Sequence, residues 1–539
     1  MKKIILSLLA LFCIIRITAQ TLTTSNLPII VINTNGQSIA DDPKIMANMG
    51  IIHNAGGVNN ITDPFNHYNG KIGIELRGQS SQSFPMKSYG IELWNASGNS
   101  VDQPLFGLPK ESDWVLYAPY TDKTLMRNFL AYTMSRELGR WAANCRYVEL
   151  VVNNDYKGIY VFMEKIKRNS GRVNISKINT ADVSGDAVTG GYIFSIDKQA
   201  DGWFSGYQTP NSTRGQRIQF SFVTPKLSAI VPAQAAYIKS YTDSFEQALA
   251  SPQFKDQVNG WRKFADENSF IDYFIVNEIS RNVDGYRLST YLYKDRQSRG
   301  GKITAGPVWD YDLAFRNANY CRGSETSGWA VDFNKDCPED FWQIPFWWSR
   351  LMEDETFRSK LRCRWKQLRQ TSLSETRINT LVDSIVNLTS AARQRHFARW
   401  RVLGIYIWPN PQPIATSYSG EIDYLKSWIS ARLNWIDRSM PNEGACYDYP
   451  LDVKENIMVE GMPNPVTSHY QLLVRSRSAQ QLDLFVADAS GRLMYKTMKM
   501  LNPGNNSFSI EMNNWPAGIY MLHISSQSGE KILKKIVKQ

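Results

Sequence analysis

The chain has 539 residues, of which 43% are hydrophobic and 12% aromatic, so it is too long for one compact core and too apolar for a disordered protein. Its 61 Lys and Arg residues exceed its 50 Asp and Glu residues, which gives a net charge of +11. Because these cations are spread along the chain without a long basic run, a solvated basic surface is a better interpretation than a nucleic-acid interface.

The N-terminus has the parts of a secretory signal peptide. Lys2 and Lys3 supply positive charge, residues 4–15 form an apolar segment, and Ala19 closes a cleavage site. The apolar segment is too short to span a bilayer, and no other stretch is long and apolar enough. We therefore expect a signal peptide over residues 1–19 and an exported mature protein without a transmembrane segment.

The segment from residue 27 to about residue 223 is predicted to be rich in strands. Hydrophobic and polar residues alternate over residues 71–76 and 147–152, as in half-buried strands. Residues 153–158 carry a turn signal, and the strand pattern resumes over residues 159–166. These last two strands are expected to form a hairpin.

Helical periodicity first occurs at residues 124–138 and dominates after Pro232. Strands followed by helices predict an α+β catalytic domain of two lobes. Beyond a linker, short strands at regular spacing predict a small all-β sandwich. The later helices are expected at residues 233–249, 267–281, 357–370, 374–400 and 419–440, and the sandwich strands at 470–474, 482–488, 493–498, 507–512, 518–524 and 531–537.

Five cysteines remain after removal of the signal peptide, and export permits disulfides. Cys321 and Cys337 flank a loop-like segment and are predicted to form a bridge. A pairing of Cys145 with Cys363 or Cys446 is a further hypothesis, and an odd number leaves at least one thiol free. Neither these spacings nor the scattered His residues resemble a zinc site.

Paired carboxylates are the main chemical signal. Asp310 and Asp312 follow a strand-like run at residues 302–304 and could converge on one side of an extended backbone, where they would hold a hard cation such as Mg²⁺. Upstream, Asp284 and Ser289 have the Asp-x-x-x-x-Asn spacing of a kinase catalytic loop, in which Asp284 would act as the catalytic base. The alternative is a turn at Asp284 and a turn-capping pair further on.

Asn282 and Ser289 bear on the prediction that this loop binds metal ions. Asn282 is expected to assist as a metal ligand or as a group that orients the base. Ser289 stands where a kinase has a metal-binding Asn and is a shorter, weaker ligand. Binding of a second metal ion, and catalysis with it, therefore stay open.

Residues 77–81 and Lys87 are predicted to contact the nucleotide. Arg77 begins this turn, whose small residues, including Ser80 and Ser81, would let backbone N–H groups approach phosphates, while Lys87 would neutralise them. The alternative is an ordinary hairpin.

Glu164 and Arg127 complete the predicted nucleotide site. Glu164 ends an apolar strand and would pair with Lys87 or border the adenine, or else pair with Lys165 or Lys167 at the strand edge. Arg127 would contact phosphate or brace its own loop.

Six ordered motifs resemble the CotH kinase family, named for a spore coat protein, over residues 27–440. The resemblance implies an atypical protein-kinase-like fold that transfers the γ-phosphate of ATP with Mg²⁺. The segments are residues 76–81 with 84–89, 125–128, 158–160 with 164–166, 190–194, 282–287 and 306–312.

The tail after a linker at residues 441–461 resembles the C-terminal sorting domain of type IX secretion. Residues 462–467, 490–493 and 515–520 carry this likeness, and a Lys-rich strand ends it. The resemblance implies that residues 462–539 engage the type IX machinery, which delivers proteins to the surface of a Gram-negative bacterium or beyond it.

These patterns predict an exported atypical kinase whose partners are ATP and a Ser/Thr-bearing secreted or surface protein. The alternatives are a non-catalytic adhesion protein on a degenerate kinase scaffold and a calcium-binding structural module. The Trp-rich stretches are expected to fill the core of the helical lobe rather than to bind sugars. They contain Trp342, Trp347, Trp348, Trp400 and Trp408.

Overall fold

The computed structural model describes residues 22–441 except 199, 212 and 214, residue 446, and residues 457–539 except 463, 477, 478, 503 and 527–530. The chain divides into two compact units, Met1–Tyr447 and Asp448–Gln539. The predicted signal peptide lies outside the described residues. Among the described residues, no helix combines the length and apolar character needed to cross a membrane.

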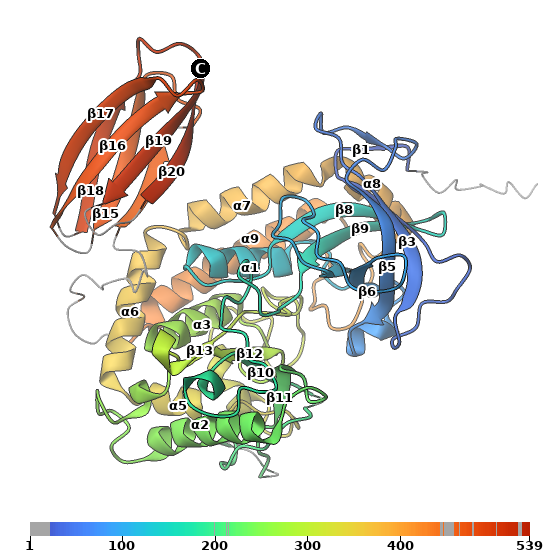
Figure 1. Ribbon diagram of the computed structural model, residues 1–539. Coiled ribbons are helices and arrows are strands. Elements are labelled where there is room, and N and C mark those ends of the chain that lie inside the picture. Colours follow the sequence, from blue (N-terminus) through green and yellow to red (C-terminus); the bar gives the residue numbers. More distant parts are fainter. Residues whose placement is uncertain are drawn as a thin grey trace, which may run out of the picture. The chain divides into compact units, whose positions relative to one another are not determined.

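The first unit begins with a closed seven-stranded barrel (Figure 1). Its strands alternate between inward apolar and outward polar residues, so Ile72, Ile74, Val148 and Leu150 fill the interior. In barrel order the strands are β2 (Ile29–Asn33), β3 (Ile45–Ile52), β5 (Tyr68–Arg77), β6 (Ser88–Trp94), β7 (Asp113–Tyr117), β9 (Asp155–Glu164) and β8 (Cys145–Val152), and a separate small pair is β1 (Thr24–Ser25) with β4 (Asn59–Asn60).

The predicted hairpin is confirmed as β8–β9, but its turn is shorter than expected. Asn153 and Asn154 have φ angles of 52° and 63°, the left-handed pair that a two-residue type I′ turn requires. Strand β9 therefore starts at Asp155, in the middle of the predicted turn.

The rest of the first unit is mainly helical, with one antiparallel sheet in the order β11-β10-β12-β13. Helix α3 contacts helices α1, α6 and α9 and strand β13, so it forms the centre of this part. The elements are α1 (Arg127–Glu137), β10 (Tyr192–Ile196), β11 (Phe220–Thr224), α2 (Pro232–Ala250), α3 (Glu267–Ser280), β12 (Thr290–Lys294), β13 (Ile303–Ala305), α4 (Phe333–Asp336), α5 (Trp347–Leu351), α6 (Glu355–Arg369), α7 (Glu375–Leu388), α8 (Ser390–Arg399) and α9 (Tyr418–Ser439).

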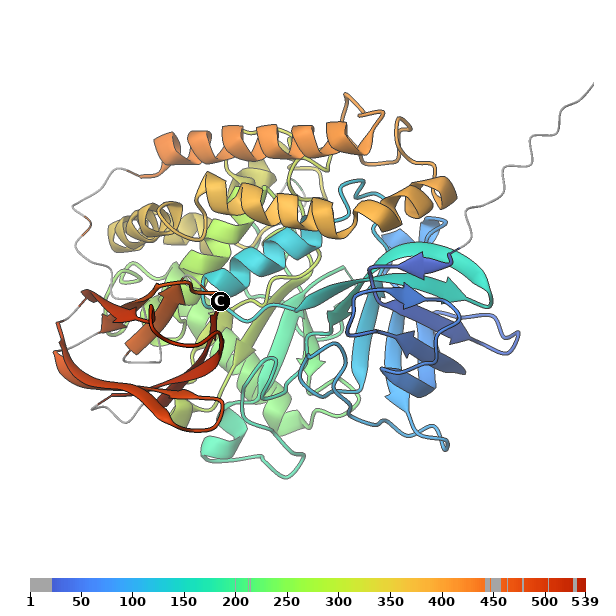
Figure 2. The same ribbon diagram turned by 90° about the horizontal axis from the view of Figure 1, so that it is seen from above.

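The single helix predicted over residues 374–400 is wrong, because the structure divides it at Thr389 into α7 and α8. The Leu388 carbonyl accepts a hydrogen bond of 2.7 Å from Asn26 of the N-terminal segment, outside the helix ladder. Helical periodicity depends on residues near in sequence and cannot predict a contact with a residue as distant as Asn26. Figure 2 shows α9 running beside α7, with which it is in contact.

The predicted Cys321–Cys337 disulfide is confirmed. The second bridge joins Cys363 to Cys446, so the hypothesis that Cys145 pairs with one of them is wrong. Cys145 is a buried free thiol. Burial raises its pKa to about 12, so it stays protonated and unreactive at neutral pH.

The second unit is the predicted β-sandwich. Strand β14 lies partly where the sequence predicted a linker and pairs with β15. The sheets have the orders β14-β15-β18 and β17-β16-β19-β20 and enclose a common apolar core. The strands are β14 (Ile457–Met462), β15 (His469–Ser476), β16 (Gln480–Asp488), β17 (Leu493–Leu501), β18 (Gly504–Glu511), β19 (Gly518–Ser526) and β20 (Lys531–Lys538).

Buried His396 of α8 makes the first unit sensitive to mild acid. Its Nδ1 accepts a hydrogen bond of 3.1 Å from the Ile159 N–H of β9, and burial lowers its pKa to about 3. The unfolded chain takes up a proton below about pH 6.5 while the folded chain does not, so stability is present above that pH and falls below it. We expect a loss of about 2 kcal/mol between pH 7.5 and pH 5 from this group alone.

The measurement is the free energy of unfolding in urea at both pH values. The variant His396→Asn keeps an acceptor for the Ile159 N–H but cannot be protonated, so it should lose about 2 kcal/mol less than the wild type over this interval. Equal pH dependence in both proteins would contradict the prediction.

Candidate functional site

The predicted carboxylate pair lies beyond β13, but its backbone is not extended as expected. Asp310 has a φ of 65°, a left-handed conformation that non-glycine residues adopt where the surroundings impose it. This turn brings the carboxyl groups of Asp310 and Asp312 close enough for each to affect the pKa of the other.

Helix α1 imposes the conformation of this turn. The Asp310 N–H donates to the Tyr132 hydroxyl at 3.1 Å, and the Tyr311 N–H donates to the Asn128 side-chain oxygen at 2.5 Å. Both acceptors lie on α1, a helix that the sequence predicted without assigning it a role in holding the carboxylates.

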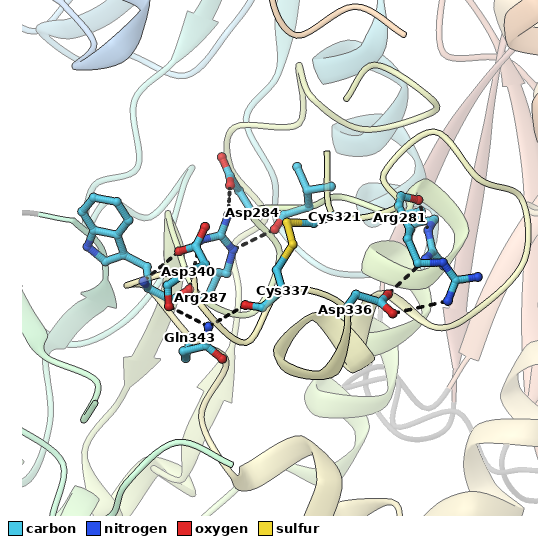
Figure 3. The surroundings of a disulfide bond; sticks show 11 residues. Arg281, Asp284, Arg287, Cys321, Asp336, Cys337, Asp340 and Gln343 are labelled. Carbon is cyan, nitrogen blue, oxygen red and sulfur yellow. Dashed lines mark hydrogen bonds and ion pairs between the residues drawn. A yellow bond between two sulfur atoms is a disulfide. The ribbon is translucent and has the colours of Figure 1, made fainter. Parts of the chain in front are cut away.

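Asn282 joins the two predicted parts of the site. Its side-chain nitrogen donates to the Asp310 carbonyl at 3.3 Å, and its side-chain oxygen accepts from the Asp284 N–H at 3.2 Å. Asp284 in turn accepts a hydrogen bond of 2.7 Å from Arg287 (Figure 3). The structure therefore places Asp284 beside the carboxylate pair, although 26 residues separate Asp284 from Asp310.

Ser289 contacts a carboxylate that the sequence analysis missed. Its hydroxyl donates to Asp197 at 3.3 Å, and the two residues face each other because Ile196 of β10 pairs with Thr290 of β12. Burial and the nearby Asp284 raise the pKa of Asp197. The only sequence signal was an acidic residue three positions after the family-like segment at residues 190–194.

The charges at this site repel one another. Burial and the carboxylates of Asp284 and Asp197 raise the pKa of Asp310 to about 6, and burial together with Asp310 raises that of Asp312. Asp310 is exposed to solvent, so repulsion from these carboxylates raises its pKa more than burial does. A bound cation would reduce the repulsion among these carboxylates.

The donor set fits a magnesium ion. Close to Asp310 and Asp312 lies the buried hydroxyl of Tyr117, which has no hydrogen-bond partner among the described residues. Within those residues, no group of three or more His, Cys, Asp and Glu side chains could hold a metal ion. Two carboxylates are a usual protein contribution to Mg²⁺, which completes its shell with water and phosphate oxygens.

Arg77 lies near these carboxylates on the barrel side, and Lys165 lies near Arg77. The Arg77 guanidinium lies 5.5 Å from the centre of the Trp309 ring, and its charge lowers the pKa of Asp310. Lys165 follows β9, where burial and then Arg77 lower its pKa to about 8. Lys165 entered the sequence analysis only as a partner for Glu164, so its position near Arg77 was missed.

The predicted nucleotide loop is the connection between β5 and β6. Gly78 has a φ of 101°, and a Cβ there would lie 1.9 Å from the Ser81 hydroxyl, so only glycine lets the loop fold this tightly. Lys198, next to Asp197, donates to the Ser80 hydroxyl at 3.4 Å. This contact places the loop near the end of β10. Lys87 donates to the Gln82 carbonyl of the same loop at 2.5 Å.

Glu164 is fully buried and has structural partners. It accepts hydrogen bonds from the Asn144 N–H at 2.9 Å and side chain at 2.8 Å, and it lies 3.7 Å from Arg172. The expected pairing with Lys87, Lys165 or Lys167 is absent from the ion pairs of the described residues, since Lys165 and Lys167 pair with Asp113.

Arg127 braces its loop, which was one of its two predicted roles. It is 2% exposed, forms an ion pair with Asp122, and donates to the carbonyls of Ala314 and Phe315 at 3.1 and 3.3 Å. It thereby connects the start of α1 to the segment that follows the carboxylate pair.

One cavity adjoins the segment that leads to the carboxylate pair. Its lining includes Arg140, Asp272 and residues 306–308, but none of the predicted site residues. Arg140 is already paired with Asp272 and Asp266. We therefore assign the chemistry to the carboxylates rather than to this cavity.

Comparison with protein families gives a match over most of the chain. Residues 74–436 match the family described as CotH kinase protein, which covers more than half of the chain. The chain belongs to the CotH kinase family. In this CotH-family chain the matched region contains every predicted site residue, from Arg77 to Asp312. None of the curated proteins matches the chain.

Residues 462–539 match a secretion system C-terminal sorting domain. This CotH-family protein is therefore exported by type IX secretion to the cell surface or the extracellular space. The match begins within β14 and covers the remaining strands of the sandwich.

Solved structures resemble only small parts of the chain. An immunoglobulin-like DUF3244 family protein from Bacteroides vulgatus is 18% identical over 15% of this chain and 96% of its own, with a TM-score of 0.12. A superoxide reductase (neelaredoxin) from Ignicoccus hospitalis is 14% identical over 16% and 81%, with a TM-score of 0.13. A β-glucosidase from Listeria innocua is 11% identical over 15% and 16%, with a TM-score of 0.12. Scores this low assign neither fold nor function.

The tryptophans of this CotH-family chain differ in their burial. Trp347 and Trp348 fill the helical core at 1% and 2% exposure, as predicted. Trp342 and Trp408 are 37% and 53% exposed, so the prediction that they fill the core is wrong. Trp342 lies beneath the Lys198 ammonium at 5.3 Å, close to the candidate site.

Proposed function

We propose that this protein is an exported atypical kinase that transfers the γ-phosphate of ATP to a Ser or Thr hydroxyl of a secreted or surface protein, with Mg²⁺. The barrel would be one lobe of a kinase-like fold, and the helical part with the β11-β10-β12-β13 sheet would be the other. The observation that supports this most is the link through Asn282 between Asp284 and the Asp310–Asp312 pair.

Asp284 would accept the proton of the substrate hydroxyl. One of its oxygens accepts the hydrogen bond from Arg287, and the other, which accepts none from the described residues, would accept from the substrate. Positioning the hydroxyl in line with the phosphate supplies most of the acceleration in this class of reaction.

Asp310 and Asp312 would hold Mg²⁺, which when bound neutralises the phosphates and the charge that develops in transfer. Arg77 and Lys165 would supply positive charge from the barrel side. The loop around Gly78 would present backbone N–H groups to the phosphates, and Ser80 and Ser81 belong to it.

The test separates binding from transfer. The variant Asp284→Asn should keep the thermal stabilisation by Mg²⁺ and ATP together but lower the transfer of labelled γ-phosphate to exported proteins by about 10³-fold, because the base is lost and the metal site is intact. A panel of nucleoside triphosphates identifies the preferred donor. Transfer at the wild-type rate would remove Asp284 from the mechanism, and no Mg²⁺-dependent binding of any nucleotide would exclude the kinase proposal.

A second candidate is a non-catalytic binding protein on the same scaffold. Phe341 and Trp342 are 60% and 37% exposed beside each other, which favours a binding surface close to the site. This function predicts binding of a surface protein or glycan that survives Asp312→Asn and weakens in Trp342→Ala. The kinase proposal predicts instead that Asp312→Asn has the larger effect and Trp342→Ala the smaller one.

A further inference from the structure

We infer that Arg287 positions the Asp284 carboxylate and that the Cys321–Cys337 disulfide holds Arg287 in place, so that the Asp284 site is completed only when this disulfide has formed. The inference rests on the proposed role of Asp284. It adds a positioning residue and a dependence on oxidation.

Arg287 controls the carboxylate directly. It is 3% exposed, and its Nη2 donates to Asp284 at 2.7 Å while its Nε donates to the Val283 carbonyl at 2.8 Å. A guanidinium is planar, so these two bonds set the direction of the carboxylate relative to its own backbone. Asp284 Oδ1 accepts the hydrogen bond from Arg287, and this bond also sets the direction of Oδ2.

Further contacts of Arg287 come from one later segment, of which Figure 3 labels Asp340. Its Nη1 donates to the Trp342 carbonyl at 3.0 Å and to Asp340 at 3.3 Å. Its guanidinium carbon lies 4.0 Å from the centre of the Phe333 ring. The position of Arg287 therefore depends on how residues 333–342 are held.

The Cys321–Cys337 disulfide closes this segment. The bridge spans 16 residues and encloses Phe333, and Gln343 donates to the Cys337 carbonyl at 3.0 Å and to the Asp340 carbonyl at 2.7 Å. Regular structure between the two cysteines is limited to Ala330–Asp332 and the short helix α4. A cross-link restricts such a segment more than its own hydrogen bonds do.

At the Cys321 end of the bridge, the backbone has a left-handed conformation that non-glycine residues rarely adopt. Cys321 and Arg322 have φ angles of 46° and 57°, values that non-glycine residues keep only where the surroundings impose them. Opening the bridge would let this turn relax and shift the segment that carries Phe333.

Other contacts keep the segment attached when the bridge is open. Arg281 donates to the Arg322 carbonyl at 2.8 Å and to the Gly328 carbonyl, and it lies 3.6 Å from Asp336. Loss of the disulfide should therefore loosen Arg287 without unfolding the unit. The expected effect is on catalysis rather than on nucleotide binding.

The bridge forms by thiol–disulfide exchange. The thiols of Cys321 and Cys337 give up two protons and two electrons, and a donor disulfide outside the cytoplasm accepts them and becomes two thiols. Reducing conditions in the cytoplasm oppose this exchange, and export removes them. The Asp284 arrangement would thus be completed after the chain leaves the cytoplasm.

The test compares three variants of the full chain: Cys321→Ser with Cys337→Ser, Arg287→Lys, and as matched control Cys363→Ser with Cys446→Ser, which removes the other bridge. We expect the first two to raise amide exchange over residues 283–288 at least about fivefold and to lower kcat at least about tenfold, with the KM for ATP and the Mg²⁺–ATP thermal shift unchanged. The control should leave exchange over residues 283–288 and kcat within about twofold of the wild type. If the double serine variant fails to fold, amide exchange is compared before and after reduction of the Cys363→Ser, Cys446→Ser control, which retains the Cys321–Cys337 bridge.

The two readouts separate the inference from the proposed function. Unchanged exchange over residues 283–288 after loss of the Cys321–Cys337 bridge overturns the inference whatever the activity. Increased exchange together with absence of transfer in the oxidised wild type supports the coupling and rejects the kinase. A fall in kcat of equal size in the control variant also overturns the inference, because the effect is then not specific to this bridge.

Discussion

Asp312→Asn should abolish the joint stabilisation of the protein by Mg²⁺ and ATP without lowering its stability in their absence. Asp312 and Asp310 repel each other when both are ionised, and burial and this repulsion raise the pKa of Asp312. A neutral amide removes the repulsion, so the unliganded variant should be as stable as the wild type or up to about 1 kcal/mol more stable. The variant keeps only one of the two carboxylates proposed to bind the cation, so cation binding should be lost.

The measurement is the thermal midpoint with Mg²⁺, ATP, both and neither. At ligand concentrations near one hundred times Kd, binding stabilises the wild type by about 2.7 kcal/mol, and this should disappear in the variant. Asp332→Asn is the control. The Asp332 carboxylate is not part of the candidate site and forms an ion pair with Lys335, with 2.6 Å between Oδ1 and Nζ. A joint shift that survives Asp312→Asn would show that the pair does not hold the cation.

Arg127→Met should destabilise the first unit by about 3–5 kcal/mol, because it leaves the Asp122 carboxylate buried without its partner. The side chains of this pair are 2% and 1% exposed. Arg127 also donates to the Ala314 and Phe315 carbonyls, which lose those bonds. A residue that contacts only phosphate would instead leave unliganded stability unchanged and weaken ATP binding.

The measurement is urea unfolding of Arg127→Met, Asp122→Asn and the double variant. Removing both members of a buried pair leaves no unpaired charge, so the double variant should be less destabilised than Arg127→Met alone. Equal stability of Arg127→Met and wild type would restore the prediction that Arg127 acts on phosphate.

Local patterns predicted most elements because the physics that forms them is local. Alternation over residues 71–76 and 147–152 led to β5 and β8, and periodicity over residues 267–281 led to α3. The prediction failed where a distant residue intervened. The break between α7 and α8 involves Asn26, which lies far away in sequence.

The candidate site shows the same division. Asp284, Asp310 and Asp312 stood out because their spacing resembles a kinase, and Asn282 because it adjoins Asp284. Asp197 was missed, since its proximity to Ser289 depends on the pairing of β10 with β12. Lys165 was missed as a neighbour of Arg77, because burial and the charges around it depend on the closed barrel.

The sequence by itself determined the class of fold through composition and periodicity, the two families and the export route through the resemblance of its motifs, and three carboxylates of the candidate site through their spacing. Only the tertiary structure decided what those carboxylates contact. It assigned Arg127 to Asp122, Glu164 to Asn144, and Arg287 to both Asp284 and the segment closed by the Cys321–Cys337 disulfide. Such contacts join residues on different elements, and their partners are chosen by packing and by the cost of leaving a buried charge unpaired, which no local pattern records.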